Sequence, residues 1–236
     1  MVKPKVAVIA NHCLYYYSTN MNFSYLYFQM SILILFSVLV GGRILYLRFK
    51  QGINAVSVVR NKGIQRILGI TVITIINVWV AILLVYILHP EIDFLSFPLN
   101  LVLLNSLPCK IFGISIICLG LAIYIAAWFA LRNTWRIGQD YKHKSDLITN
   151  GIYKISRNPM YLFYNLYFVG SFFVNGALVF LILAVLLITN LHYLIIQEEK
   201  SLYMTYGIFW EKYSQRTGRY LTWNRLLRMK STIRED

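Results

Sequence analysis

Residues 158–197 read NPMYLFYNLYFVGSFFVNGALVFLILAVLLITNLHYLIIQ and contain no Lys, Arg, Asp or Glu. This stretch of 40 residues is twice as long as a single membrane crossing, which needs about 20 apolar residues. Asn175-Gly176, near its middle, is a strong turn signal. The stretch is therefore predicted to form an antiparallel pair of helices, over about 159–174 and 177–196. At 1.5 Å per residue these helices would be roughly 24 and 30 Å long, which is short but adequate for crossing a membrane.

Three further uncharged stretches extend the pattern toward the amino terminus. They cover residues 24–42, 67–88 and 111–131. Charged residues make up 14% of the chain and hydrophobic residues 58%, whereas a soluble domain carries about 25% charged residues. The sequence thus predicts an all-α, polytopic membrane protein with about five transmembrane helices and a cytoplasmic helical tail. Residues 1–236 are expected to form one membrane domain, with a three-helix part over 1–131 and the loop, helical pair and tail over 132–236.

The basic residues that give the chain its net charge of +14 are concentrated in three regions between and after the predicted spans. Of the 23 basic residues, 20 fall within 43–66, 132–157 and 200–234, and five spans would place all three regions on one side. The positive-inside rule then predicts an outside amino terminus and a cytoplasmic carboxyl terminus, in a bacterial inner membrane or the endoplasmic reticulum. Membrane lipids are expected partners. Nucleic acid is not, because no soluble basic module is visible.

The glycines and histidines of the chain bear on helix packing and on metal binding. Gly41-Gly42 and Gly113 with Gly120 allow close helix contacts. The four histidines have no metal-ligand spacing, so no metal site is expected. They are His12, His89, His143 and His192. The sequence leaves the oligomeric state open.

The predicted hairpin brings two distant segments together on the cytoplasmic face. RNPMY at 157–161 begins the first helix, and residues 194–199 end the second. Two carboxylates at a helix carboxyl terminus, Glu198 and Glu199, are unfavourable next to the negative end of the helix dipole. Either Glu198 points into water and Glu199 pairs with a nearby cation, Lys200 or Arg157, or one carboxylate receives a cationic ligand.

Two motifs carry a family resemblance. LITNGIYKISRNPMYLF at 147–163 and EEKSLYMTYGIFWEKYSQRTGRYL at 198–221 follow each other at the expected separation. Together they resemble the isoprenylcysteine carboxyl methyltransferase and phospholipid methyltransferase superfamily, whose pattern is approximately L-V-T-x-G-x-Y-x-x-x-R-H-P-x-Y, then E-E-x-x-L-x-x-x-[FY]-G-x-x-[YW]-x-x-Y. The resemblance implies a methyltransferase that uses S-adenosylmethionine and acts on a lipid-like or prenylcysteine-type acceptor.

The resemblance also implies the cofactor-binding residues. They are Gln139, Ser145, Asp146, Leu147, Ile148, Tyr153, Asn158, Pro159, Met160, Tyr161 and Glu198. A carboxylate at Glu198 suits the sulfonium and ammonium of the cofactor, and the rings of Tyr153 and Tyr161 can stack on adenine or attract the sulfonium. Arg157 and Glu199 are predicted to orient the acceptor or neutralise charge in catalysis.

Two positions depart from the family pattern. Asn158 stands where the family usually has histidine, and Leu194 stands where the isoprenylcysteine branch has an arginine that meets the substrate. His192 is the nearest replacement for that arginine. The methyltransferase activity is therefore better supported than any particular acceptor.

Two other functions remain open. The sterol reductases share a related C-terminal half but use NADPH, whose 2′-phosphate Arg136, Lys142 and Lys144 could bind. The third function is a non-enzymatic membrane scaffold or a transporter, although transporters commonly show repeats and charges near the midplane of the membrane.

Overall fold

The computed structural model describes residues 23–51, 63–89, 95, 97–131 and 147–222. These residues form helices and contain no β-strand, which confirms the predicted all-α membrane fold. The elements are α2 (Phe23–Gln51), α3 (Ile64–Leu88), α4 (Leu107–Leu131), the 3₁₀ turn η3 (Gly151–Lys154), α5 (Pro159–Asn175), α6 (Leu178–Tyr206) and α7 (Ile208–Arg216).

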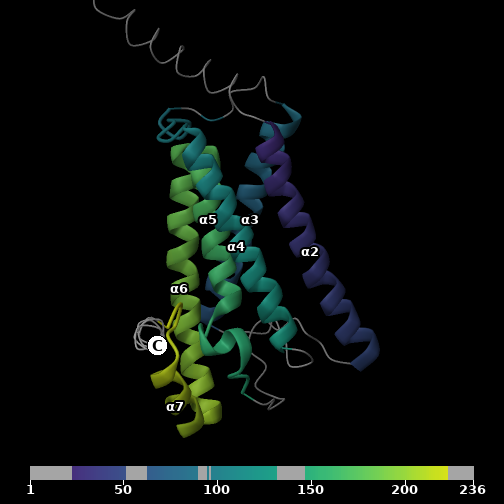
Figure 1. The fold of residues 1–236 in the computed structure, drawn as a ribbon, viewed down its shortest axis with the longest axis vertical. Helices are drawn as coiled ribbons and strands as arrows, with labels where there is room; N and C mark the ends of the chain where they lie inside the picture. The colour runs from purple at the N-terminus through teal and green to yellow at the C-terminus, as the bar shows by residue number, and fades with distance from the viewer. Residues whose placement is uncertain (1–22, 52–62, 90–94, 96, 132–146, 223–236) are drawn as a thin grey trace, which may run out of the picture.

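The five long helices run alternately up and down in one bundle, and α7 lies at the end where α5 begins (Figure 1). Four of them are long and apolar enough to cross a membrane, namely α2, α3, α4 and α6. Helix α5, predicted as a further span, has 17 residues and is about 25 Å long. It packs against α4 and α6, so it forms part of the bundle although it is the shortest of its members.

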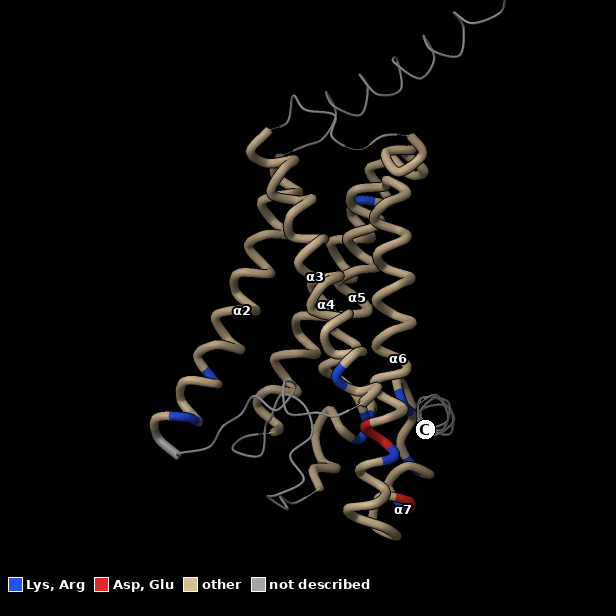
Figure 2. The backbone as a smooth tube through the Cα atoms, turned by 180° about the vertical axis from the view of Figure 1, so that it is seen from behind, with Lys and Arg blue, Asp and Glu red and all other residues tan. Residues whose placement is uncertain are grey.

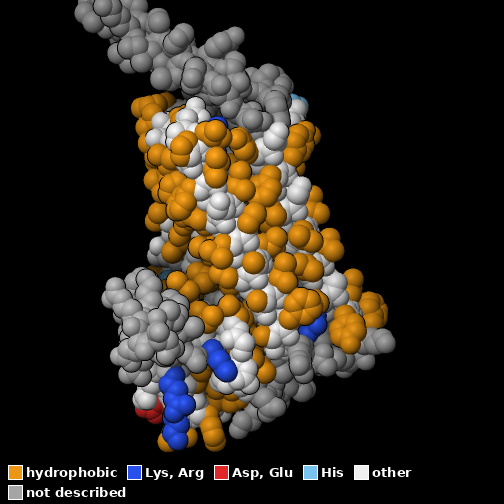
Figure 3. All heavy atoms as spheres, viewed as in Figure 1, with side chains coloured by type: hydrophobic (Ala, Val, Ile, Leu, Met, Phe, Trp, Pro, Cys, Tyr) orange, Lys and Arg blue, Asp and Glu red, His pale blue; other side chains and the backbone are white. Residues whose placement is uncertain are grey.

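Charge and apolar surface are separated along the bundle. Most of the Lys and Arg residues in the described part of the chain lie near the end that carries α7 (Figure 2). Apolar side chains cover most of the visible face between the two ends (Figure 3). A surface with this pattern suits a protein whose middle section faces lipid. Which end faces the cytoplasm stays a prediction.

The turn between α5 and α6 is held by the chain that precedes α4. Gly176 has φ of 74°, in the left-handed region, and closes α5 by donating its N–H to Phe172 O at 2.7 Å. A Cβ at Gly176 would collide with the carbonyl of Leu104, which donates its own N–H back to Gly176 O at 3.2 Å. Only glycine satisfies both the backbone angle and this close approach.

Helices α4 and α5 approach closely at a pair of glycines. A Cβ on Gly170 would lie 2.6 Å from Gly113 O, and a Cβ on Gly113 would meet Gly170 O in turn. A Cβ on Gly120 would lie 3.1 Å from the side chain of Leu166. The predicted role of Gly113 and Gly120 in close packing is therefore confirmed, whereas nothing lies within 4 Å of a Cβ on Gly41 or Gly42.

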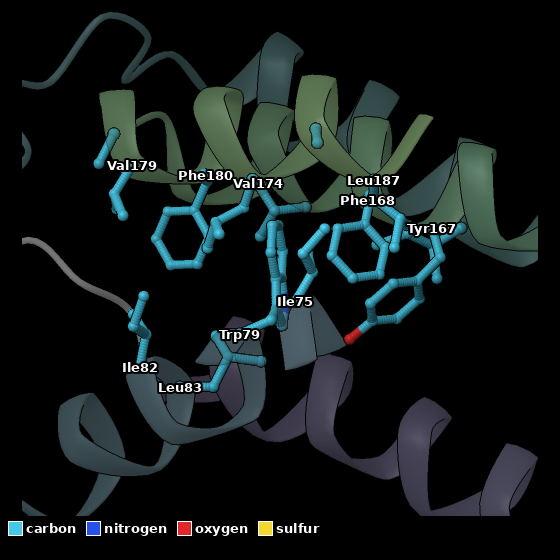
Figure 4. Close-up of a cluster of buried hydrophobic side chains, with 14 of the residues drawn as sticks. Ile75, Trp79, Ile82, Leu83, Tyr167, Phe168, Val174, Val179, Phe180 and Leu187 are labelled. Carbon is cyan, nitrogen blue, oxygen red and sulfur yellow. The ribbon is translucent and has the colours of Figure 1, made fainter. Parts of the chain in front are cut away.

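An aromatic core joins α3 to the hairpin (Figure 4). Trp79 of α3 is fully buried, and its ring centroid lies 4.3 Å from that of Phe168 and 4.9 Å from that of Phe180. Interlocked aromatic pairs of this kind add to the stability given by burial alone.

Helix α2 is tied to α5 by a buried polar cluster. The side-chain amide oxygen of Gln29, Oε1, accepts hydrogen bonds from Ser171 Oγ and from Asn175 Nδ2, the latter at 2.9 Å. The Tyr167 hydroxyl donates to Gln29 O at 3.2 Å. Polar groups in an apolar bundle are satisfied by one another here, so these contacts fix the position of α2.

Candidate functional site

The hairpin brings the start of α5 and the end of α6 together, as the sequence predicts. The Tyr161 hydroxyl donates a hydrogen bond to Glu198 Oε1 at 2.6 Å, and Asn158 Nδ2 donates to Glu199 Oε1 at 3.2 Å. Asn158 precedes the helix and Pro159 occupies its first turn, where the missing N–H of proline costs no hydrogen bond. Residues separated by about forty positions in the chain thus share one site.

The two glutamates have different surroundings although they are adjacent. Arg157 Nη2 lies 3.1 Å from Glu199 Oε1, while Arg219 Nη2 and Nε lie 2.8 and 3.0 Å from Oε2. With the Asn158 bond, both carboxylate oxygens of Glu199 carry two donors each, which uses the acceptor capacity of a carboxylate. Glu199 is buried, and its charge is already neutralised by protein cations.

Glu198 is half-buried and has a single described hydrogen bond. Among the described residues, Tyr161 alone donates to it, and no arginine or lysine pairs with it. A half-buried carboxylate without a counter-charge is unfavourable unless a cationic partner approaches. Of the alternatives set out above, Glu199 does pair with Arg157, and Glu198 is the carboxylate that can receive a cationic ligand.

Tyr153 forms the neighbouring wall of the site. It lies in η3, is buried, and accepts a hydrogen bond on its backbone oxygen from the Tyr213 hydroxyl at 2.7 Å. Burial raises the pKa of the Tyr153 phenol far above its usual value, and the nearby Tyr213, Glu198 and Tyr124 act in the same direction. The phenol therefore stays protonated as a hydrogen-bond donor between Glu198 and α4.

A C-terminal segment, residues 217–222, closes the site from the side of α7. Arg157 N donates to Gly218 O at 3.0 Å, and Thr222 N donates to Ile155 O at 2.9 Å. Thr222 Oγ1 adds a bond to the same Ile155 oxygen at 2.7 Å. The segment places Arg219 against Glu199, and the hydrogen bonds to Glu199 raise the pKa of Arg219 further above its already high value.

Sequence reasoning missed Arg219 and the segment that carries it. Gly218 was the available signal, because a glycine after a short helix marks a turn, and a Cβ there would collide with the carbonyl of Leu221. The contact between Arg219 and Glu199 depends on the tertiary structure and cannot be predicted from the spacing of residues in the sequence.

Other predicted residues lie at the margin of the described site. Leu147 and Ile148 are half-buried and directly precede η3, while Met160 packs against the core. The predicted residues Gln139, Ser145 and Asp146 lie outside the described part of the chain.

Leu194, which stands where the isoprenylcysteine branch has an arginine, has apolar surroundings. Leu194 packs against the core of the bundle. His192 Nδ1 lies 2.9 Å from the Tyr220 hydroxyl, and the two rings are stacked with centroids 6.1 Å apart. His192 is therefore engaged with the C-terminal segment.

Residues 108–208 match the family model described as phospholipid methyltransferase. This range runs from the first turn of α4 to the first residue of α7 and includes Tyr153, Tyr161 and Glu198. This part of the chain is similar to that family, which belongs to the isoprenylcysteine carboxyl methyltransferase-like superfamily of membrane methyltransferases. No curated protein and no solved structure matches the chain.

The membrane methyltransferase match ends before the C-terminal segment that supplies Arg219. The match also leaves out α2 and α3, so Gln29 and Trp79 lie outside the matched range, whereas the α5 and α6 residues that they contact lie inside it. Within its described residues, no three His, Cys, Asp or Glu side chains form a group that could hold a metal ion.

Proposed function

We propose that this membrane methyltransferase uses S-adenosylmethionine and methylates a lipid-like acceptor at the cytoplasmic face of the membrane. The observation that carries the proposal is the difference between the two glutamates. Glu199 is contacted by Arg157, Arg219 and Asn158, whereas Glu198 has, among the described residues, only the Tyr161 hydroxyl. A cofactor with two cationic groups supplies the partner that Glu198 lacks.

The donor set around Glu198 fits this cofactor. Tyr161 and Tyr153 are aromatic, lie beside the carboxylate, and can attract a sulfonium through their ring faces. When bound, S-adenosylmethionine would supply an electrophilic methyl group to the acceptor. Tyr153, Tyr161 and Glu198 would bind and orient the cofactor, and the buried Tyr153 would help to exclude water.

We assign Arg157 and Glu199 a role different from the catalytic one predicted for them from the sequence. Glu199 pairs with both Arg157 and Arg219, and both side chains of the Arg157–Glu199 pair are only 11% exposed. We assign them as positioning residues, which hold the start of α5, the end of α6 and the C-terminal segment in register around Glu198. Rigid support of this kind is what keeps a binding group in its productive geometry.

A lipophilic acceptor suits the position of the site. Glu198 lies near the end of α6, a helix apolar enough to cross a membrane, so a membrane-dissolved acceptor can approach sideways while a soluble cofactor enters from water. With Leu194 in the core, an arginine for the carboxylate of a prenylcysteine is absent from that position. Phosphatidylethanolamine-like amines, prenylcysteines and small thiols are the acceptors to compare.

The test is calorimetric titration of the purified full chain with S-adenosylmethionine and S-adenosylhomocysteine. Removing the charge in Glu198→Gln is expected to weaken binding by at least about tenfold, the effect of losing a hydrogen bond to a charged group. The matched control is Glu211→Gln, because Glu211 is exposed on α7. Failure of both ligands to bind the wild type, or equal binding by the two variants, would refute the proposal.

Two further measurements identify the reaction. Displacement of the bound ligand by NADPH would favour the reductase alternative. Transfer of labelled methyl from S-adenosylmethionine to the three acceptor classes identifies the substrate, and Glu198→Gln should lower the rate with whichever class reacts.

A further inference from the structure

One arginine lies among apolar side chains near the end of α2. The Arg43 guanidinium carbon is 5.0 Å from the ring centroid of Trp128 on α4 and 6.0 Å from that of Tyr46. Its Nε and Nη2 atoms are buried, and neither has a hydrogen-bond acceptor among the described residues. The cation–π contacts supply part of the attraction that this cation needs, but they leave both N–H groups unused.

Arg43 differs from the other arginine described on the same helix. Arg48 lies five residues further along α2 and is exposed, as expected for a side chain that reaches water beyond the apolar stretch Ser24–Tyr46. The buried nitrogens of Arg43 do not reach water in this way. An ionisable residue that is kept inside a membrane bundle without a described counter-charge points to a functional role.

Two more unused donors lie beside Arg43. Tyr124 and Trp128 are four residues apart on α4 and so share one face of that helix. The Tyr124 hydroxyl and Trp128 Nε1 are both buried without a hydrogen-bond partner in the described part of the chain. The Tyr124 hydroxyl is also within electrostatic range of Arg43. The N–H groups of Arg43 and Trp128 can only donate, and a phenol donates readily, so the complementary ligand is an anionic acceptor.

This donor cluster, Arg43 with Tyr124 and Trp128, adjoins the proposed cofactor site. The Tyr153 phenol is within electrostatic range of both Tyr124 and Glu198. Turn η3, which carries Tyr153, packs against the end of α4, where Ala130 lies 3.8 Å from a Cβ built on Gly151. Tyr153 is thus near both the carboxylate suited to a cation and the donor cluster suited to an anion.

The surroundings of the donor cluster are apolar. Leu45 and Phe49, on the same end of α2, are 54% and 81% exposed. In this region α2 diverges from α4 toward its Gln51 end (Figure 1), and Figure 2 shows the same divergence from behind. An exposed apolar surface of a membrane helix is in contact with lipid tails, so the tail of an amphiphile can remain there while its headgroup reaches Arg43.

Resting on the function proposed above, we infer that Arg43, Tyr124 and Trp128 bind the anionic group, a carboxylate or a phosphate, of an amphiphilic methyl acceptor. The guanidinium supplies charge and a planar pair of donors, which both anions can accept in bidentate fashion. The phenol and the indole complete the set. A neutral headgroup would leave the arginine uncompensated, so the cluster selects acceptors by charge.

The test compares ten-carbon probes of equal tail length by titration of the purified full chain in detergent. The probes are decanoate, decyl phosphate and the neutral decanol. The wild type is expected to bind the tighter of the two anions at least about tenfold more strongly than decanol, and that anion identifies the headgroup chemistry. Arg43→Gln should abolish this preference. Arg48→Gln, the matched control on the same helix, should retain it.

Tyr124→Phe serves as a second variant, since it removes one hydroxyl and no charge. It should lower the preference for the anion by about threefold to tenfold even where Arg43→Gln yields no folded protein. Each folded variant should still bind S-adenosylhomocysteine within about twofold of the wild type, because Glu198 is untouched.

Two results would overturn the inference. They are a wild type that does not distinguish the anions from decanol, and an anion preference that both Arg43→Gln and Tyr124→Phe retain. The inference is separable from the proposed cofactor. An anion preference that depends on Arg43 in a chain that binds neither S-adenosylmethionine nor its product would establish the anion site and refute the cofactor proposal alone.

Discussion

Replacing Glu199 by glutamine should destabilise the protein, whereas the same change at Glu198 should not. Glu199 receives four charge-assisted or polar contacts of 2.8–3.2 Å from three residues, and its side chain is 11% exposed. Glutamine keeps one oxygen, which can still accept from Arg157 or Asn158. Its amide group, however, would face Arg219 donor to donor.

The expected cost follows from the burial of the pair. Breaking a buried ion pair costs about 3–5 kcal/mol, because the remaining charge loses its partner. We expect the lower end, about 3 kcal/mol, because Arg219 is 35% exposed and can turn to water, while Arg157 cannot. For a chain of this size, about 3 kcal/mol corresponds to a fall in Tm of about 6–12 °C.

The assay is thermal unfolding of the purified variants in one detergent, followed by tryptophan fluorescence. Glu211→Gln, at an exposed position, provides the baseline for loss of one carboxylate. Glu198→Gln should unfold close to that baseline, because no cation is paired with Glu198 among the described residues. A Glu199→Gln variant that unfolds within about 2 °C of Glu211→Gln, less than the shift expected for 1 kcal/mol, would refute the assignment of Glu199 as a structural ion-pair centre.

Two further changes test the packing that builds the site. Gly170→Ala should destabilise the protein by about 1–3 kcal/mol in the same unfolding assay, because its Cβ would lie 2.6 Å from Gly113 O. Gly42→Ala is the control and should not destabilise the protein, because nothing lies within 4 Å of a Cβ at that position. Equal unfolding temperatures of the two variants would contradict the close α4–α5 contact. Thr222→Val removes the hydroxyl that donates to Ile155 O and accepts from Gly218 N. It should speed proteolytic cleavage of the C-terminal segment by at least about threefold to tenfold, the effect of losing one hydrogen bond. An unchanged cleavage rate would show that the hydroxyl does not hold the segment.

The helical bundle and the meeting of its two motifs were predictable from local features. An uncharged stretch of about 20 residues and an Asn-Gly turn need no knowledge of distant contacts, and the antiparallel pair that they define brings 157–161 beside 194–199 by geometry alone. The structure confirms the pairing through Tyr161 and Glu198. The span predicted over about 159–174 is a helix of the bundle, α5, but it is shorter than the four helices long enough to cross a membrane.

The different roles of Glu198 and Glu199 could not be predicted in this way. Neighbouring residues of a helix point about 100° apart, so one faces Tyr161 and the other faces Arg157 and Arg219. Which glutamate takes which direction depends on the rotation of α6 about its own axis. That rotation is set by packing against α3 and α5, which is a property of the assembled bundle.

Composition and the order of apolar and charged stretches were enough to indicate a membrane bundle, because the cost of placing charge in lipid acts on each segment separately. The contacts of Arg43 with Trp128, of Arg219 with Glu199 and of Gly113 with Gly170 join parts of the chain that are 20 to 85 positions apart. Each depends on where helices stop, how they are rotated and how closely they approach. These quantities are settled only when all the helices pack at once, since each side chain then competes for the same limited space.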